Sequence, residues 1–415
     1  MIKKITTLIL ILGAAITYAQ QGTSSPYSYF GIGESKFKGA PEQKSMGGVS
    51  IFPDSTHVNL LNPASYSGLK FTAITVGGSG TFTTMETSDN SEKSKRSSLE
   101  YLAVGIPIGK FGVAFGLNPN TVVGYRVLNK PTDNTTASQY EGEGGSNRVF
   151  LGGAYKLNDK LDIGLNANYY FGEITTISRM YTQDIQFGTR IDNILNINAF
   201  SLDLGVTYKG KIADKYDFHA AATFTPSYSI DIKKLTYVGT VSTVSGYERY
   251  DDIEELPTVT DKYKMPSTVG AGFGVGKFKK WFVAADMAFS GKSDFSNPIS
   301  GSYATYKNNS GYKLALGGFY IPNYNSFTSY FERVTYRGGV RYQDTGLEVN
   351  GEKITDIGAS LGFNLPIGNG YSDLSFAFEY GKRGTVNAGL IQENYFNVTI
   401  GITIVDKWFR KYLFD

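Results

Sequence analysis

Segments in which apolar and polar residues alternate recur along most of this chain. In residues 161–169 the odd-numbered positions are large and apolar, except for Ala167, and the even-numbered positions are polar or glycine. Residues 200–208, 374–380 and 396–404 repeat the pattern. A period of two predicts β-strands with one apolar and one polar face. The apolar faces would point either into the core of a soluble sandwich or outward into lipid.

The connections between these segments favour lipid. Short and long connections alternate, with one long exception in the short set and one short exception in the long set. Short periplasmic turns and long external loops are typical of outer-membrane barrels. A β-helix or a two-sheet sandwich is the alternative, because both share the period of two, but neither is expected to show this rhythm. The short connections are 108–110, 157–160, 277–280 and 366–371, and the exceptions are 321–333 and 346–353.

The pattern therefore predicts an all-β fold, a fourteen-stranded antiparallel transmembrane β-barrel. Each tilted strand needs about 9–11 residues to cross the bilayer. The sheet must close on itself, because unpaired backbone amides cannot remain in lipid. The expected strands are 70–85, 98–107, 111–128, 145–156, 161–183, 195–209, 217–230, 262–276, 281–290, 310–320, 334–345, 354–365, 372–381 and 394–405.

The N-terminus predicts export. Lys3 and Lys4 precede an apolar stretch at 5–16, and a small-residue cleavage site ends at Ala19, so residues 1–19 are read as a signal peptide. The alternative, a retained anchor, is disfavoured because the apolar stretch is shorter than the roughly 18 residues that a spanning helix needs. The chain contains no cysteine, which excludes disulfides and a lipid-modified cysteine at the mature end. We expect the protein to be located in the outer membrane of a Gram-negative bacterium.

Composition agrees with a barrel in contact with outer-membrane lipid. Aromatic residues make up 14% of the chain, with 30 Tyr, 27 Phe and 49 Gly. Aromatic rings line both interfaces of membrane barrels. The formal net charge is +3, and removing the signal peptide with its two lysines leaves +1 (3 − 2). This balance gives no indication of nucleic-acid binding.

Residues 20–68 show little alternation and are rich in Gly, Ser and Pro, yet they contain scattered apolar residues. A fourteen-stranded barrel is too wide for wall side chains alone to fill, and irregular backbone is tolerated at membrane depth when protein encloses it. We interpret this segment as an N-terminal hatch, or plug, in the lumen. The alternative is a disordered periplasmic leader. The expected organisation is a signal peptide at 1–19, a hatch at 20–68, a transmembrane barrel at 69–406 and a periplasmic tail at 407–415.

Short motifs at the two ends of the chain carry a family resemblance. The triplet Asn62, Pro63 and Ala64 at the end of the hatch, ahead of the barrel, resembles the FadL family of outer-membrane transporters for hydrophobic compounds. The two ends of this chain also resemble those of a FadL-like branch of the family. The middle of the chain resembles the family only in its architecture. The resemblance implies a hydrophobic ligand that enters from outside and leaves sideways through a gap in the wall. The end motifs lie at 25–33, 45–48, 379–385, 393–396 and 406–409.

The resemblance places that gap at a kink in the third strand, where this chain has Asn118, Pro119 and Asn120. A proline inside a strand cannot donate to the ladder and marks a bulge or a break. We therefore predict a lateral exit near Pro119. The alternative is that Pro119 ends the membrane-embedded part of the strand near the outer rim.

The polar faces carry charges of both signs, which an apolar fatty-acid conduit is not expected to have. Internal ion pairs that clamp the hatch are one interpretation. Recognition of an anionic headgroup by Arg337 and Arg341 is the other. The inward-facing polar positions are Asn166, Asn168, Asp203, Asp286, Lys313, Arg337, Arg341, Asp356 and Glu379.

Catalytic and metal-binding chemistry is sparse. The two histidines, His57 and His219, each have one carboxylate close in sequence, Asp54 and Asp217, which falls short of a zinc ligand set. We predict no metal, no cofactor and no enzymatic activity. The acidic run at 251–255 offers oxygen ligands for calcium, but a solvated loop is the favoured interpretation.

Three functions remain open. The first is an outer-membrane transporter that passes small hydrophobic or amphipathic molecules through a plugged lumen, with lateral exit near Pro119. The alternative is a non-transporting accessory barrel, a subunit of a larger outer-membrane protein assembly or secretion machine, whose partners are other outer-membrane proteins. The third is a surface adhesin that uses an expected loop at 231–261. The transporter predicts an apolar cleft between hatch and wall, and a sealed, ion-paired lumen argues against it.

Overall fold

The computed structural model describes residues 22–51, 54–129, 136–242, 248–293, 305–368 and 371–408. The expected signal peptide at 1–19 and most of the tail lie outside these residues. Five short helical segments and one short strand precede or interrupt the wall: η1 (Pro26–Tyr29), β1 (Glu34–Ser35), α2 (Pro41–Lys44), η2 (Pro63–Gly68), η4 (Phe331–Arg333) and η5 (Asn387–Gly389). The remaining elements are β2 (Thr72–Glu86), β3 (Ser91–Ile108), β4 (Phe111–Asn129), β5 (Thr136–Lys156), β6 (Leu161–Thr182), β7 (Gly188–Ile212), β8 (Tyr216–Thr225), β9 (Tyr228–Ser242), β10 (Arg249–Met265), β11 (Thr268–Lys277), β12 (Trp281–Ser290), β13 (Tyr306–Asn308), β14 (Gly311–Tyr320), β15 (Thr335–Val349), β16 (Glu352–Ile367), β17 (Ser372–Arg383) and β18 (Gln392–Asp406).

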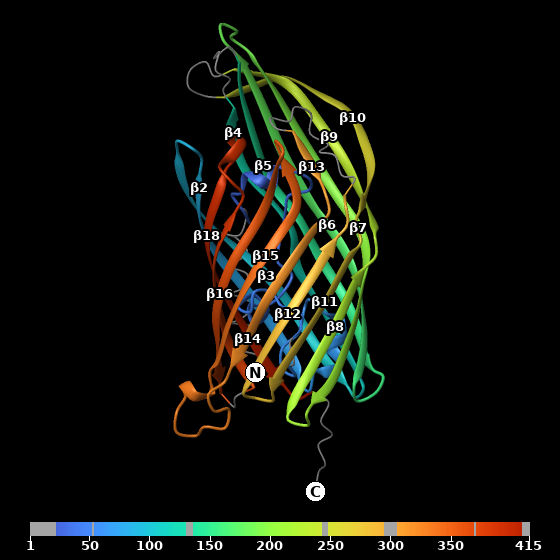
Figure 1. Ribbon diagram of the computed structural model, residues 1–415. Helices are drawn as coiled ribbons and strands as arrows, with labels where there is room; N and C mark the ends of the chain where they lie inside the picture. Colours follow the sequence, from blue (N-terminus) through green and yellow to red (C-terminus); the bar gives the residue numbers. More distant parts are fainter. Residues whose placement is uncertain are drawn as a thin grey trace.

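These strands form one closed antiparallel barrel (Figure 1). β8 continues into β9, β10 into β11, and β13 into β14, so the wall consists of fourteen strands as the alternation predicted. β18 pairs with β2 from Gln392↔Glu86 to Asp406↔Thr72, which closes the sheet. Closure leaves no free edge in the hydrocarbon region.

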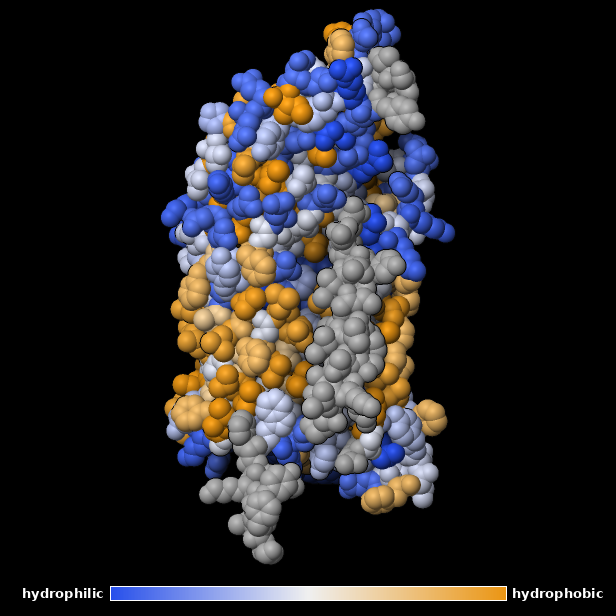
Figure 2. All heavy atoms as spheres, turned by 180° about the vertical axis from the view of Figure 1, so that it is seen from behind, coloured by the Kyte–Doolittle hydropathy of each residue, from blue (hydrophilic) through white to orange (hydrophobic). Residues whose placement is uncertain are grey.

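The apolar faces of the strands point outward. Phe200, Leu202 and Leu204 are 58%, 39% and 42% exposed, whereas the intervening Ser201 is buried. On the face that Figure 2 shows, hydrophobic residues gather in a band across the lower half of the barrel, with hydrophilic residues above. An outward apolar band is what lipid requires of a spanning barrel, so the chain is a transmembrane β-barrel. Among the described residues there is no helix whose length and hydropathy would let it cross a membrane.

Several strands continue far beyond the apolar band. β5, β6 and β7 contain 21, 22 and 25 residues, about twice what a crossing needs. The prediction of a long loop at 231–261 was wrong, because this stretch forms most of β9 and β10, which pair with each other from Tyr228↔Met265 to Ser242↔Arg249. Polar and charged residues on both faces removed the periodicity that identifies a strand.

The N-terminal segment, by which we mean residues 22–51 and 54–68, lies inside the barrel (Figure 1). Tyr29 and Phe30 pack among inward-facing side chains of the long strands, including Tyr125 and Tyr170, and Tyr29 is 1% exposed. Lower in the barrel, Tyr66 packs against Phe150 in a second cluster. The inner core therefore consists of the segment and the wall together.

Candidate functional site: the N-terminal segment and the break in the wall

The predicted triplet Asn62, Pro63 and Ala64 begins η2 and rests directly on the wall. The Asn62 side chain accepts a hydrogen bond from the Ala64 amide at 3.0 Å and so caps the turn. Gly164 on β6 and Gly205 on β7 are cross-strand partners under this turn. A Cβ atom on Gly205 would lie 2.9 Å from Pro63 Cδ, and one on Gly164 would lie 2.6 Å from the Pro63 carbonyl oxygen. The paired glycines form a notch, and the triplet is an anchor that fills it.

A second glycine notch receives the segment on another side of the barrel. Gly317 on β14 and Gly339 on β15 are cross-strand partners. A Cβ atom on either would come within 2.6 Å of the Met46 backbone. The Gly48 carbonyl next to it accepts a hydrogen bond from Lys313 Nζ at 3.0 Å. The backbone of the segment is thus in direct contact with the wall at two separate places. At these two places no space is left between the segment and the wall.

The charged residues of the lumen are paired. Arg341 donates to Glu379 at 2.8 Å and lies 3.4 Å from Asp356. Arg383 lies 3.0 Å from the same Asp356 and 2.5 Å from Glu34 in the N-terminal segment. Arg341 is therefore committed to two wall carboxylates, and this network ties the segment to β16 and β17. Of the two interpretations of Arg341, internal ion pairing therefore agrees better with the structure than recognition of an anionic headgroup.

A second network surrounds His57. Its Nδ1 lies 2.6 Å from Asp54, its Nε2 lies 2.6 Å from Asp373 on β17, and Glu42 is 3.7 Å away. Burial by itself would lower the pKa of His57, but Asp373, Asp54 and Glu42 raise it well above its ordinary value. The imidazolium thus joins the segment to the wall.

The same network contains a candidate metal set and the second predicted arginine. Glu42, His57 and Asp373 place one ligand atom each within 4.8 Å of one another. Both imidazole nitrogens of His57, however, already have carboxylate partners, which a protonated ring satisfies without a metal. Arg337 donates to Asn364, whose amide contacts Glu42 at 3.3 Å. Arg337 and Arg341 therefore lie in two different networks.

The wall is divided between β3 and β4. Their ladder runs from Ile108↔Phe111 to Leu102↔Leu117 and stops immediately before Asn118. Above this point β4 pairs instead with β1, through Glu34↔Val122 and Ser35↔Thr121. Its other ladder, with β5, has a register shift between Pro119 and Thr121. The bulge and the end of the ladder coincide with the predicted triplet.

Polar contacts fix β4 at the bulge to β5 on one side and to the N-terminal segment on the other. Arg148, 1% exposed, donates to Asn118 Oδ1 at 2.9 Å, and Asn120 donates to Ser146 at 3.1 Å. The Asn120 carbonyl accepts from the Lys36 amide at 2.9 Å. The N-terminal segment therefore covers the break in the wall through backbone pairing.

The structure separates the predicted site residues into three places: the η2 anchor, the β4 bulge and the arginine networks. Sequence reasoning missed the buried Arg148, the Arg383–Glu34 pair and the contact of His57 with Asp373, all of which join distant parts of the chain. The sequence showed Gly164 and Gly205 as small residues at inward positions of alternating strands. It did not show that the turn at Asn62, Pro63 and Ala64 packs against them.

Comparison with solved structures places the fold among outer-membrane channels. The chain is similar to the CymD monoaromatic hydrocarbon channel, with a TM-score of 0.59 and 15% identity, over 90% of this chain and 99% of that chain. For the toluene transporter TbuX of Ralstonia pickettii the TM-score is 0.57 and the identity 14%, over 89% and 98% of the two chains. For a FadL homologue of Pseudomonas aeruginosa the TM-score is 0.56 and the identity 10%, over 88% of this chain and 97% of that chain.

These similarities confirm the FadL-type architecture that the end motifs predicted, and with it the assignment to an outer-membrane class of barrels. At such low identity they show the fold alone. No curated protein matches the chain. A family model, described as BamG, matches residues 1–415, so this protein belongs to the BamG family.

Proposed function

We propose that this chain is a non-transporting accessory barrel, a subunit of a larger outer-membrane protein assembly or secretion machine. The observation that carries the proposal is the direct contact of the N-terminal segment with two paired-glycine notches in the wall. A conduit needs a continuous space, and packed interiors do not provide one without rearrangement. In this proposal residues 20–68 are a permanent hatch that makes the barrel a rigid support.

The interior charges point to the same role. Arg341 and Arg383 lie in a network that includes Asp356, Glu379 and Glu34, and His57 is held by carboxylates from both the segment and the wall. Displacing the segment would leave buried charges without partners, which costs about 3–5 kcal/mol for each broken pair. A subunit that presents surfaces to partners benefits from such rigidity, whereas a gated transporter must overcome it repeatedly.

The second candidate is a transporter of small hydrophobic or amphipathic molecules, with Asn118, Pro119 and Asn120 at its lateral exit. It is supported by the end of the β3–β4 ladder at Leu117 and by the likeness to hydrocarbon channels. For this function the β1 pairing with β4 would have to open. The signal peptide at 1–19 and the periplasmic tail at 407–415 belong to both proposals.

The two candidates are separated by a pull-down from native outer membranes. The chain carries a C-terminal affinity tag at its chromosomal locus, and the eluate is quantified by mass spectrometry after mild detergent extraction. The accessory role predicts one or more outer-membrane proteins at near-equimolar yield with the bait. Recovery of the barrel alone, at several detergent concentrations and after chemical crosslinking, would reject the accessory role.

A further inference from the structure

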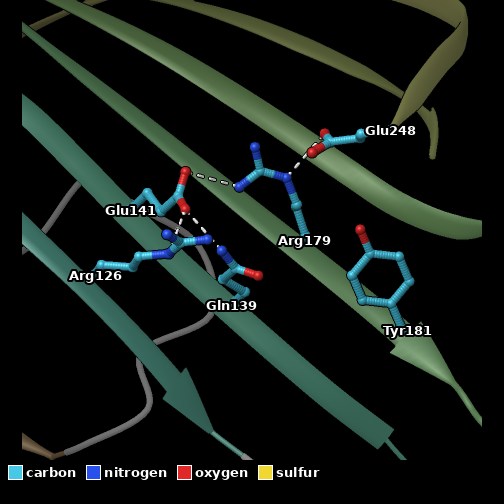
Figure 3. A pocket seen from close by; sticks show the side chains of 6 residues that line it. All are labelled: Arg126, Gln139, Glu141, Arg179, Tyr181 and Glu248. Carbon is cyan, nitrogen blue, oxygen red and sulfur yellow. Dashed lines mark hydrogen bonds and ion pairs between the residues drawn. The ribbon is translucent and has the colours of Figure 1, made fainter. Parts of the chain in front are cut away.

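A polar pocket is lined by side chains of β4, β5 and β6 and by Glu248, the residue before β10 (Figure 3). Arg126 on β4 is the cross-strand partner of Glu141 on β5, and Gln139 on β5 is the partner of Arg179 on β6. The neighbouring positions Tyr125 and Tyr140 face the N-terminal segment inside the barrel, so the pocket residues point outward. The cavity has a volume of about 310 Å³ and is lined by Arg126, Gln139, Glu141, Arg179, Tyr181 and Glu248.

Ion pairs run through the pocket, although the Arg126 side chain is itself 76% exposed. Arg179 lies 2.9 Å from Glu141 on one side and 2.9 Å from Glu248 on the other. Arg126 lies 2.9 Å from Glu141, and Gln139 donates to the same carboxylate at 2.7 Å. Glu248 is also bound to Arg190 at 2.7 Å, which fastens the residue before β10 to the wall. Arg179, whose side chain is 9% exposed, is thus held between two carboxylates.

The pocket stands above the membrane. The outward positions of β6 are apolar through Phe171 and change to Glu173, and Arg179 follows six residues later. At a rise of 3.2–3.4 Å per residue, Arg179 lies roughly 20 Å along the strand beyond this change. The outer surface at this height faces the zone that the sugars of outer-leaflet glycolipids occupy.

Within the described residues several polar groups of the pocket have no hydrogen-bond partner. These are the two terminal nitrogens of Arg126, the Gln139 side-chain oxygen and the Tyr181 hydroxyl. They offer both donors and acceptors beside an aromatic ring, and the two arginines and two glutamates cancel in charge. A simple anion or cation would gain little from a site with no net charge.

We propose that this pocket binds a sugar residue. Sugar hydroxyls donate and accept hydrogen bonds at once, which matches the mixed set at Arg126 and Gln139. The C–H face of a pyranose stacks on an aromatic ring such as that of Tyr181, which has an apolar face and a polar tip. The volume suits one to two sugar rings. The sugar comes either from a membrane glycolipid or from a soluble glycan.

The test uses the full mature chain in deuterated phosphocholine micelles, which carry no sugar headgroup. Saturation-transfer NMR is recorded with the methyl glycosides of glucose, galactose, mannose and N-acetylglucosamine. We expect at least one glycoside to bind, and Tyr181→Ala and Gln139→Ala each to weaken its signal by about fivefold or more through loss of stacking and hydrogen bonds. Tyr181→Phe, which keeps the ring, should retain part of the signal.

Arg249→Ala is the matched control. Arg249 is the first residue of β10, is 78% exposed and pairs with Asp251 outside the pocket, so its loss should leave sugar binding unchanged. The heat-modifiable gel shift of the barrel confirms that each variant is folded. Binding of none of the glycosides by a folded wild-type barrel, or binding that Tyr181→Ala and Gln139→Ala leave intact, would overturn the proposal.

The source of the sugar is resolved in a second pair of measurements. Nanodiscs that contain lipopolysaccharide report on the glycolipid, and the lipid-free polysaccharide reports on a soluble glycan. Tyr181-dependent binding in the nanodisc alone identifies the membrane glycolipid, and equal binding in both identifies a soluble or shared glycan. Either result supports the pocket, and Tyr181-independent binding in both contradicts it.

Discussion

Val58 in the N-terminal segment and Gly105 on β3 face each other across the inner surface of the barrel: a Cβ atom on Gly105 would lie 3.9 Å from Val58 Cβ. This separation falls in the range of 3.5–4.5 Å that disulfides require. Val58 is 1% exposed, so the pair is enclosed by protein. The β3–β4 ladder ends at Leu102, and Gly105 lies within the ladder three residues further along β3.

The first prediction is that Val58→Cys/Gly105→Cys forms a disulfide. The natural chain has no cysteine, so no competing pair exists. We expect near-complete oxidation in the purified barrel, measured as a 2 Da mass decrease and as loss of thiol reactivity after heat denaturation. Val58→Cys alone is the control for accessibility. A fully reactive pair in the folded double variant would show that the segment does not rest on β3.

The second prediction concerns the notch under the Asn62 turn. Gly205→Val should drive a side chain into Asn62 and Pro63, and overpacking of this kind costs about 1–3 kcal/mol. The measurement is the temperature at which the barrel loses its heat-modifiable gel shift. Gly153→Ala on β5 is the control, because a Cβ atom there meets nothing within 4 Å. Equal stability of both variants would mean that the turn does not fill the notch.

The third prediction concerns the Arg341 network. Arg341→Met leaves Glu379 without its 2.8 Å partner and removes one of the two arginines at Asp356. Loss of one member of a buried pair typically costs 3–5 kcal/mol. Adding Glu379→Gln should recover part of the loss, because the unpaired charge is gone. A double variant that is less stable than Arg341→Met would contradict the pairing.

The fourth prediction is a pH window for the attachment of the N-terminal segment. The folded-state pKa of His57 is raised above its ordinary 6.5, so its stabilisation is complete below that value and is lost as the pH rises through the raised pKa. Burial would raise the pKa of Asp54, but His57 lowers it below its ordinary 3.8. Its stabilisation is therefore present above about pH 4 and is lost on acidification.

Amide hydrogen exchange of residues 54–68 should consequently be slowest between about pH 4 and the raised pKa of His57. The measured rates are first corrected for the pH dependence of intrinsic exchange. His57→Gln should remove the alkaline limb of this profile. His219→Gln is the control, because His219 lies on β8 against Phe282 and, among the described residues, forms no ion pair with the segment. A corrected profile that is flat in the wild type would show that the ionic contacts do not attach the segment.

Much of the barrel was predictable because a lipid-facing strand must alternate. The expected strand at 281–290 matches β12 in full, and the break at Pro119 followed from the missing amide of proline. The extracellular parts were not predictable in this way. β10 carries exposed residues on both faces, so it has no period of two to detect.

The interior contacts depend on pairs that are far apart in sequence. The sequence identified Arg337 and Arg341 as inward residues, but only the barrel register brings Asp356 and Glu379 to Arg341. In the same way, Asp54 was the only carboxylate recognisable near His57, since Asp373 comes from β17. Local patterns specify which face a residue occupies and not which distant partner it meets.

The central claim, that the N-terminal segment does not move in function, is tested by uptake through the locked barrel. Cells that lack the wild-type gene express Val58→Cys/Gly105→Cys, and partner recovery and uptake of radiolabelled toluene are measured before and after reduction. We predict undiminished partner recovery with the disulfide intact, and uptake equal to that of cells without the barrel in both states. Uptake that appears only after reduction, without stoichiometric partners, would contradict the accessory role and establish a gated transporter.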